Sequence, residues 1–463
     1  MKNKILFILA TIFALQIEAA PYFSAQRTEQ PIPMIRQILR KVPTINKVRQ
    51  EFGLEPVISL GIGQPHIPMN NRVIENLIST LEDYLKLPPE EQAAFTGYTL
   101  SAGTEKTRNS IRDLFNASYP KVSFEAEEVM VANGAAGAMS NALHSFVEQG
   151  TKVAAIAPYF GAYQNQIDVC QGSLIPCVRK PGDSPAQALK NNLDETIKVF
   201  IWNDPNNPLG NKATREELED VATVLRKYPN LIIIHDEVYR DLIHARKEPA
   251  LLDIAPDLLD RSIVIRSISK DIAGAPGLRA GMAATKMVAK TPSGMEKPVI
   301  ELMANYQLQD IASISIITQE LLCLAIHDYL SGYSDEWSNH AIEEYTNNAK
   351  KLSEGLEKIG LKIYSKANSA FYVCVDCSNL IGKKIPDRVD FPGLHTRIGS
   401  DTIRDDIDIA YYLLWSVGVA TVPLQGFGLD PNEATGLRLS CAVTEKQIDE
   451  ALKRIELALE KLF

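Results

Sequence analysis

The sequence predicts an α/β protein: a large domain with a mostly parallel central sheet flanked by helices, and a smaller α+β domain. From about Leu39 onward, short apolar runs alternate with amphipathic segments, as in a parallel sheet whose strands are buried on both faces. After Ile317 the pattern changes to long helical segments followed by two more strand candidates. We expect residues 76–325 to form the large domain and 326–463 the small one, with 26–75 as an amino-terminal arm completing part of it.

Composition excludes several classes of protein. The chain has 463 residues, 45% of them hydrophobic, and its 48 Lys and Arg against 57 Asp and Glu give a net charge of −9. This balance argues against a basic nucleic-acid-binding face, and we expect no nucleic acid partner. Cys374 and Cys377 form a C-x-x-C at an apolar run, where buried thiols are the simpler interpretation, and we expect no metal.

Residues 1–25 resemble a secretion leader. Lys2 and Lys4 precede an apolar run from Ile5 to Ile17, and Ala19 and Ala20 supply small residues for cleavage. The run has 13 residues, fewer than the roughly 20 that span a bilayer as a helix. We therefore expect no stable membrane span and an exported, periplasmic or secreted protein. The alternative is a cytoplasmic protein whose leader is a frayed or docked helix.

The elements follow from periodicity and residue type. The expected strands of the large sheet are rich in Val, Ile and Ala and nearly free of charge: 129–132, 153–157, 198–202, 231–234, 263–265 and 281–284. Helices are expected after the first of these strands, to about Val147, and at 214–226, where apolar residues lie among charges. The tail predicts helices at 318–330 and 338–359, then strands at 361–364 and 371–375.

Polar and small residues gather where these strands end. The first strand runs into Asn133 to Gly137, whose small side chains would let helix-terminal amides approach an anion, although close helix packing explains them equally well. The later strands end in P-Y-F (158–160), N-D-P-N-N-P-L-G (203–210), H-D-E-V-Y (235–239) and S-I-S-K (267–270), with Arg279 nine residues further. Open α/β sheets bind ligands at these carboxyl ends, so the sequence predicts a site there.

In this order, the strand ends resemble the class I and II aminotransferase family, pyridoxal-phosphate enzymes of fold type I. The resemblance covers about Val57 to Ser440. Its most specific parts are N-N-P-x-G, D-E-V-Y, and S-x-S-K followed by Arg279. It implies pyridoxal 5′-phosphate as the cofactor and amino and 2-oxo acids as substrates.

The resemblance implies three catalytic residues, Lys270, Asp236 and Tyr239. Lys270 would hold the cofactor as an imine and, once displaced, move a proton between the substrate α-carbon and cofactor C4′. Asp236 would pair with the pyridinium nitrogen, and Asn207 and Tyr239 would bind the ring oxygen. Without the surrounding motifs, Lys270 would be interpreted as a surface residue and Asp236 as a helix cap.

Further roles follow from the same resemblance. Phe160 would stack on the cofactor ring, with Tyr159 as the less favoured choice. The phosphate ligands would be the Ala135 and Ala136 amides, Ser267, Ser269 and Arg279. Tyr98 in G-Y-T resembles a tyrosine that reaches the neighbouring subunit's phosphate, which implies a homodimer. Phe160 could otherwise be simple core.

Arg438, Gly63 and Asn207 are the expected substrate contacts. Arg438 in G-L-R-L-S resembles the arginine that binds the substrate α-carboxylate, a task suited to a bidentate guanidinium, although an ordinary ion pair is the alternative. No motif locates a second substrate arginine, so the sequence does not predict aspartate specificity. We interpret the protein as an aminotransferase of L-amino acids and 2-oxo acids. Asp271 and P-G-L-R (276–279) keep open a β-eliminating or ring-closing lyase related to 1-aminocyclopropane-1-carboxylate synthase.

Overall fold

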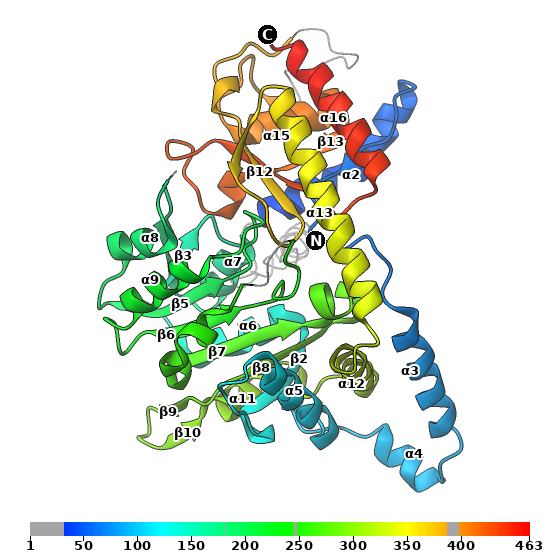
Figure 1. Cartoon of the computed structure of the whole chain (residues 1–463), viewed down its shortest axis with the longest axis vertical. Helices are drawn as coiled ribbons and strands as arrows, with labels where there is room; N and C mark the ends of the chain where they lie inside the picture. The colour runs from blue at the N-terminus through cyan, green and yellow to red at the C-terminus, as the bar shows by residue number, and fades with distance from the viewer. Residues whose placement is uncertain (1–31, 181, 245–247, 387–397) are drawn as a thin grey trace, which may run out of the picture. The chain divides into compact units, whose positions relative to one another are not determined.

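A seven-stranded sheet forms the centre of the larger part of the fold (Figure 1). The computed structural model describes residues 32–180, 182–244, 248–386 and 398–463. The strands, in sheet order, are β2 (Val129–Asn133), β8 (Ala280–Ala284), β7 (Ser262–Ser267), β6 (Ile232–Asp236), β5 (Ile197–Asn203), β3 (Lys152–Ala157) and β4 (Ser173–Val178). Only β8 runs antiparallel to its neighbours in this sheet. The predicted α/β class with a mostly parallel sheet is confirmed.

Helices cover both faces of this sheet and enclose two hydrophobic cores. One core includes residues of α3 (Asn71–Tyr84), α5 (Glu105–Ser118), α8 (Pro185–Asn192), α9 (Arg215–Leu225) and α12 (Ile316–Leu330). The other includes residues of α6 (Gly134–Phe146), α7 (Ala162–Val169) and α11 (Val299–Ile311). On β5, Phe200 and Trp202 join the first core, and Val199 and Ile201 the second. This alternation explains why the strand sequence is apolar throughout.

The helix predicted at 214–226 shows how local sequence sets an element. Thr214 precedes α9, and its hydroxyl accepts a hydrogen bond from the Glu217 amide at 3.2 Å. The Glu217 carboxylate accepts one in return from the Thr214 amide at 3.0 Å, which completes a capping box. The buried residues of α9, among them Leu218, Val221 and Leu225, recur at helical spacing and pack on the sheet.

The edge strand β4 and the hairpin of β9 (Val288–Lys290) and β10 (Glu296–Pro298) were not predicted from the sequence. β4 contains Pro176 and several partly exposed residues, so it lacks the uninterrupted apolar run of an inner strand. β9 and β10 are three residues long and largely exposed, which leaves no burial pattern to detect.

A second sheet of four strands carries the other half of the ligand site. Its order is β11 (Lys362–Ser365), β12 (Tyr372–Asp376), β15 (Gly436–Ser440) and β14 (Val422–Pro423). It shares a core with α13 (Asp335–Lys358), α15 (Asp406–Ser416) and α16 (Glu445–Glu460). In Figure 1 this part lies beyond the carboxyl ends of the large sheet's parallel strands.

The amino-terminal arm joins the smaller part of the fold. Residues of α2 (Met34–Glu51) enter its core, and β1 (Ile58–Ser59) pairs in parallel with β13 (Val419–Ala420). Two short helices, α4 (Pro89–Phe95) and α10 (Leu251–Ile254), lie elsewhere in the chain. The predicted domain boundaries stay predictions, and the leader lies outside the described residues. Among the described residues, no helix is long and apolar enough to cross a membrane.

Candidate active site

A cavity of about 340 Å³ lies where the ends of β5, β6 and β7 meet the start of α6 and the second sheet. Twelve of the residues predicted to bind cofactor or substrate line it: Gly63, Ala135, Ala136, Phe160, Asn207, Asp236, Tyr239, Ser267, Ser269, Lys270, Arg279 and Arg438. Tyr98 does not. The structure therefore brings together in one hollow residues that are spread over 376 positions of sequence, from 63 to 438.

Lys270 supplies a primary amine at the centre of this cavity. It lies in a short π-helical turn, Ile268–Ile272, directly after β7, and its Nζ donates a hydrogen bond to the Gly63 carbonyl oxygen at 2.5 Å. Burial lowers its pKa to about 7, and the positive charges of Arg438 and Arg279 act in the same direction. A large fraction of the amine is therefore neutral at neutral pH, which is the form that attacks an aldehyde.

Asp236, the last residue of β6, faces the cavity with one oxygen unsatisfied. Its Oδ2 accepts a hydrogen bond from the Tyr163 hydroxyl at 2.5 Å, and its buried Oδ1 has no partner. Burial raises the pKa of this carboxyl to about 6, while the Tyr163 hydrogen bond opposes that rise. A buried acceptor without a donor requires one from a ligand, and a protonated ring nitrogen meets that need.

One end of the cavity is built for an anion. The first turn of α6 begins at Gly134 with φ +70°, and its free amides belong to the following residues, Ala135 and Ala136. Arg279 is packed against this turn, because a Cβ on Gly134 would lie 2.2 Å from Arg279 Nη2. Within the described part of the chain, the guanidinium donates only to carbonyl oxygens, those of Pro276 at 2.8 Å and Asn133 at 3.3 Å.

The loop after β5 holds Asn207 against the second sheet. Asn203 Oδ1 accepts from the Asn207 amide at 2.9 Å, while its Nδ2 donates to the Asp236 carbonyl at 3.0 Å. Gly210, with φ +66°, lies so close to β12 that a Cβ would meet the Tyr372 carbonyl oxygen at 2.1 Å. Any side chain at position 210 would therefore push this loop away from β12.

Arg438 is a fully buried cation on β15. Its Nη1 donates to Asn207 Oδ1 at 2.9 Å and its Nη2 to the Gly61 carbonyl at 2.6 Å, while Nε has no partner. Among the described residues no acidic side chain forms an ion pair with it. The guanidinium instead lies over the rings of Tyr372 and Phe427, at 4.5 and 4.9 Å from their centroids. Such a cation can take a carboxylate from outside the chain.

Tyr239 stands beside Lys270 and is held by another tyrosine. Its hydroxyl lies 2.8 Å from that of Tyr372, and burial raises its pKa well above the usual range. Lys270 Nζ lies 5.7 Å from the centroid of the Tyr239 ring. The hydroxyl is therefore held by Tyr372 in its protonated form, with the amine beside the ring.

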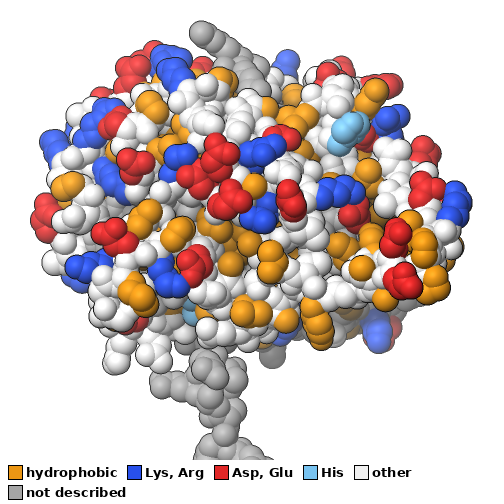
Figure 2. All heavy atoms as spheres, turned by 90° about the horizontal axis from the view of Figure 1, so that it is seen from below, with side chains coloured by type: hydrophobic (Ala, Val, Ile, Leu, Met, Phe, Trp, Pro, Cys, Tyr) orange, Lys and Arg blue, Asp and Glu red, His pale blue; other side chains and the backbone are white. Residues whose placement is uncertain are grey.

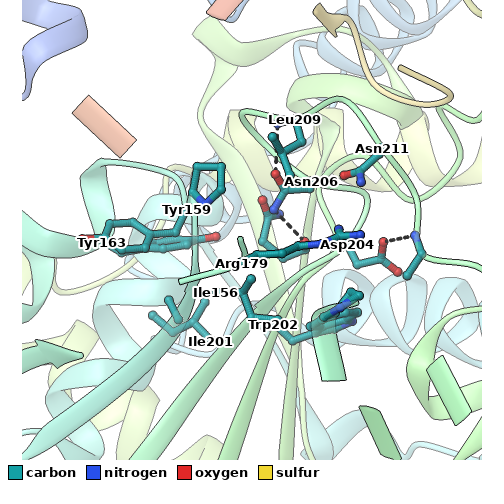
Figure 3. Close-up of a pocket in the computed structure, with 15 residues that line it drawn as sticks. Ile156, Tyr159, Tyr163, Arg179, Ile201, Trp202, Asp204, Asn206, Leu209 and Asn211 are labelled. Atoms are coloured by element: carbon teal, nitrogen blue, oxygen red, sulfur yellow. Dashed lines mark hydrogen bonds between the residues drawn. The ribbon is translucent and has the colours of Figure 1, made fainter. Parts of the chain in front are cut away.

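A smaller cavity of about 40 Å³ is lined by Tyr159 and shares Tyr163 and Asn203 with the larger one (Figure 3). Tyr159 and Tyr163 lie on one side of it and Asp204 and Trp202 on the other. Tyr159 does not line the larger cavity, whereas Phe160 does. Of the two aromatic residues considered for ring stacking, Phe160 has the suitable place.

The lining residues that the sequence reasoning missed include three that hydrogen-bond to other parts of the site: Tyr163, Tyr372 and Asn203. Tyr163 and Tyr372 hold Asp236 and Tyr239, but each reaches its partner only after the elements have packed. Asn203 could have been found, because it opens the polar run at the end of β5. Tyr98 is 93% exposed and remote from this chain's cavity, so its predicted role across a dimer stays a prediction.

Comparison with known proteins identifies the chain. A sequence model of the family described as aminotransferase class I and II matches residues 55–455. The chain belongs to this family. The predicted activity and cofactor are thereby confirmed: the protein is a pyridoxal-phosphate-dependent aminotransferase.

Named relatives agree with this assignment. A probable aspartate/prephenate aminotransferase of Rickettsia felis is 27% identical over 428 residues, covering 91% of this chain and 94% of that protein. An aspartate aminotransferase of Rhizobium meliloti is 26% identical over 414 residues, covering 88% and 90%. The crystal structure of an aspartate aminotransferase from Rhizobium meliloti has a TM-score of 0.80 at 23% identity, covering 96% of this chain and all of that one, and it shows the shared fold.

The cavity of the aminotransferase fits the cofactor. Asp236 Oδ1 lacks a donor that a pyridinium nitrogen would supply, and the α6 turn with Arg279 offers an anion cradle. The Lys270 amine lies in the same hollow, in reach of a bound aldehyde. These three features match the three chemical ends of pyridoxal phosphate.

Proposed function

We propose that the aminotransferase binds its amino acid and 2-oxo acid substrates by their α-carboxylate at Arg438 and uses Lys270 to move the proton. The observation that carries this proposal is the buried guanidinium of Arg438, which has a free Nε and no acidic partner among the described residues. An uncompensated buried charge is costly, so it is kept where a ligand neutralises it. Lys270 lines the same cavity.

Each residue of the cavity has its own role in the proposed reaction. When bound, pyridoxal phosphate carries the amino group and accepts the electron pair of the substrate Cα–H bond. Lys270 Nζ, neutral in part near pH 7, would take the substrate Cα proton and deliver it to cofactor C4′. Asp236 Oδ1 would accept from the ring nitrogen, and Asn207 Nδ2 and the Tyr239 hydroxyl would donate to the ring oxygen. Arg279, Ser267 and Ser269 would hold the phosphate end.

Replacing Arg438 tests the carboxylate assignment. Arg438→Lys should lower kcat/KM for both substrates about 10- to 100-fold, mostly through KM, because an ammonium cannot reproduce the fork. Arg226→Lys, at an exposed ion pair with Asp257, is the control and should change neither constant. An unchanged KM in Arg438→Lys would assign the residue to structure. Conversion of the cofactor to its amine form by an amino acid alone, without release of ammonia, separates transamination from a lyase outcome.

We further propose that one preferred substrate carries an acidic side chain. Arg36, on α2, lies at the mouth of the cavity, is exposed, and forms no ion pair with a described residue. The relatives are named for aspartate, which has a second carboxylate, and their names support this reading. Ile35, Leu39 and Ile62 beside it provide apolar contact for the side-chain stem.

The side-chain proposal has its own test. Arg36→Gln should raise KM for aspartate about tenfold and leave KM for a monocarboxylic amino acid within twofold of the wild-type value. Arg40→Gln, one turn further along the exposed side of α2, is the matched control. Equal changes for both amino acids would refute a role in side-chain recognition.

We propose that the aminotransferase is a homodimer. Large apolar side chains are exposed on the segment that contains Tyr98: Leu85 is 71% exposed and Leu100 69%. Figure 2, a view from below Figure 1, shows exposed hydrophobic side chains among charges of both signs. Exposed apolar groups of this size favour burial against a second copy.

Mixing two inactive variants tests the dimer and the reach of Tyr98 together. A Tyr98→Ala chain mixed with a Lys270→Ala chain should regain activity, because one site of the mixed dimer then holds Lys270 and its partner's Tyr98 intact. Sedimentation should show two chains per particle. A monomer, or a mixture with only the sum of the separate activities, would contradict the proposal.

We also propose export, with a cytoplasmic location as the alternative. The charged start, the apolar run 5–17 and the small residues 19–20 support it. Cleavage near residue 20 would leave every cavity residue in place, since these begin at Ile35. Amino-terminal sequencing of the protein purified from its own cell should give a start near residue 21, and an intact Met1 would refute cleavage.

A further inference from the structure

Tyr372 occupies the point where the carboxylate site meets the cofactor site. Strand register pairs Cys374 with Arg438 and Tyr372 with Ser440, so Tyr372 and Arg438 project from the same face of the second sheet. The Arg438 guanidinium carbon lies 4.5 Å from the centroid of the Tyr372 ring. The Tyr372 hydroxyl lies 2.8 Å from that of Tyr239, which belongs to the other sheet's strand ends. Tyr372 itself is fully buried.

The surroundings of this tyrosine pair hold few charges. Arg438, Tyr239 and Cys441 face Tyr372, and the Tyr372 hydroxyl also fills the space beside Gly63, where a Cβ would lie 2.4 Å from it. Tyr239 is faced by Tyr372, Arg438 and Asp236, and by the Lys270 amine near its ring. Among the described residues, Arg438 is thus the one formal positive charge placed directly against the Tyr372 ring.

A cation over a phenol ring strengthens the O–H as a donor. Burial raises the pKa of Tyr372, and the charge of Arg438 pulls it back down. If Tyr372 donates to the Tyr239 oxygen, the proton of Tyr239 is left free to point toward the cofactor's ring oxygen. Chained hydrogen bonds polarise one another, so each strengthens the next.

We propose that Tyr372 is a positioning residue through which occupation of Arg438 by a carboxylate changes the hydrogen bond that Tyr239 gives to the cofactor. With Arg438 unpaired, Tyr372 is a strong donor and Tyr239 donates strongly in turn. A substrate carboxylate neutralises the guanidinium and weakens both bonds. The basicity of the bound cofactor therefore rises when a substrate carboxylate binds. The inference rests on the roles proposed above for Arg438 and Tyr239.

The holoenzyme's visible absorbance measures this link directly. A weaker donor to the ring oxygen raises the basicity of the cofactor, so the midpoint pH of the absorbance change rises. Tyr372→Phe should raise the ligand-free midpoint by about 0.3 to 0.7 pH unit. It should also cut the further rise caused by saturating propionate or succinate to less than about half of the wild-type rise.

Two further proteins separate this effect from lost packing. Tyr412→Phe removes the hydroxyl of another buried tyrosine in the same part of the fold, one that donates to the Ala458 carbonyl at 2.8 Å, and should leave both midpoints at wild-type values. Replacement of Tyr372 by 3,5-difluorotyrosine keeps the hydroxyl, makes it a stronger donor, and should lower the ligand-free midpoint. This opposite sign keeps the test available even if Tyr372→Phe folds poorly.

The outcomes of these experiments distinguish the role inferred for Tyr372 from the carboxylate binding proposed for Arg438, on which it rests. Equal midpoints in wild type, Tyr372→Phe and the difluorotyrosine protein would overturn the tyrosine link. A carboxylate-induced rise that survives in Arg438→Gln would instead overturn the carboxylate assignment, whatever Tyr372 does to the ligand-free midpoint. Loss of the rise in Arg438→Gln, with a reduced rise in Tyr372→Phe, supports both.

Discussion

Removing the Tyr163 hydroxyl should make the stability of the cofactor-free protein more sensitive to pH. That hydroxyl donates to Asp236 Oδ2 at 2.5 Å, while Oδ1 has no partner, so Tyr163→Phe leaves the whole carboxylate without a side-chain donor. A hydrogen bond to a charged group contributes about 1.5–3 kcal/mol. At 1.36 kcal/mol per unit, its loss should raise the Asp236 pKa, already near 6, by roughly one to two units.

The sign of the stability effect follows from linkage. Asp236 has a folded pKa above its unfolded value, so it binds a proton more tightly in the folded state, and stability falls as pH rises toward that folded pKa. In Tyr163→Phe this fall extends to higher pH. The variant should therefore be about 1.5–3 kcal/mol less stable than wild type at about pH 8, and close to wild type at about pH 5.

Chemical unfolding of the cofactor-free protein at both pH values measures this. Tyr412→Phe is the control, because its lost hydroxyl bonded a neutral carbonyl and its deficit should not vary with pH. A Tyr163→Phe deficit that is the same at both pH values would show that the hydroxyl does not stabilise the charged carboxylate.

Three other substitutions or conditions give clear expectations. Lys270→Ala should lower kcat by at least about 10²-fold, and retention of more than about a hundredth of the activity would remove its proton-transfer role. Capture of pyridoxal phosphate by cofactor-free wild type should speed up as pH rises to about 7 and then level off, because the neutral amine reacts; a flat stopped-flow profile would contradict the lowered pKa. Gly134→Ala should weaken cofactor binding at least about tenfold by displacing Arg279, whereas Gly150→Ala, with a similar φ of +84° and open space, should not.

Much of this site could be predicted from the sequence, because the site residues lie at the ends of successive parallel strands. Asp236 is the last residue of β6, and Asn207 and Lys270 follow within four residues of the ends of β5 and β7; the carboxyl ends of parallel strands meet at one edge. Family resemblance added Arg438, which lies on another sheet and has no such positional signal. The fold confirmed the predicted class, and the family match confirmed the predicted family, activity and cofactor.

The tertiary contacts of the site were beyond reach of the sequence. Tyr163 lies on a helix facing Asp236, and Tyr372 sits in a strand that was predicted at 371–375 with no indication of its partner. Tyr372, on the four-stranded sheet, meets Tyr239, which follows β6 of the seven-stranded sheet, only in the folded chain. β4 was missed because Pro176 and partial exposure break the pattern of a buried strand. The role predicted for Tyr98 would depend on a second copy of the chain.

The close approach of Gly210 to β12 bears on how the enzyme would recognise the two ends of its substrate, the α-carboxylate and the side chain. The Asn207 loop lies close against β12 there, and Arg438 on the adjacent strand bonds Asn207, so the residues proposed to bind the carboxylate common to all substrates form one unit. The proposed side-chain end of the cavity is bounded instead by Ile35, Arg36 and Leu39, which lie on α2. On this proposal, new substrate ranges would arise by exchanging residues on one helix, while the geometry shared by every amino acid would stay unchanged.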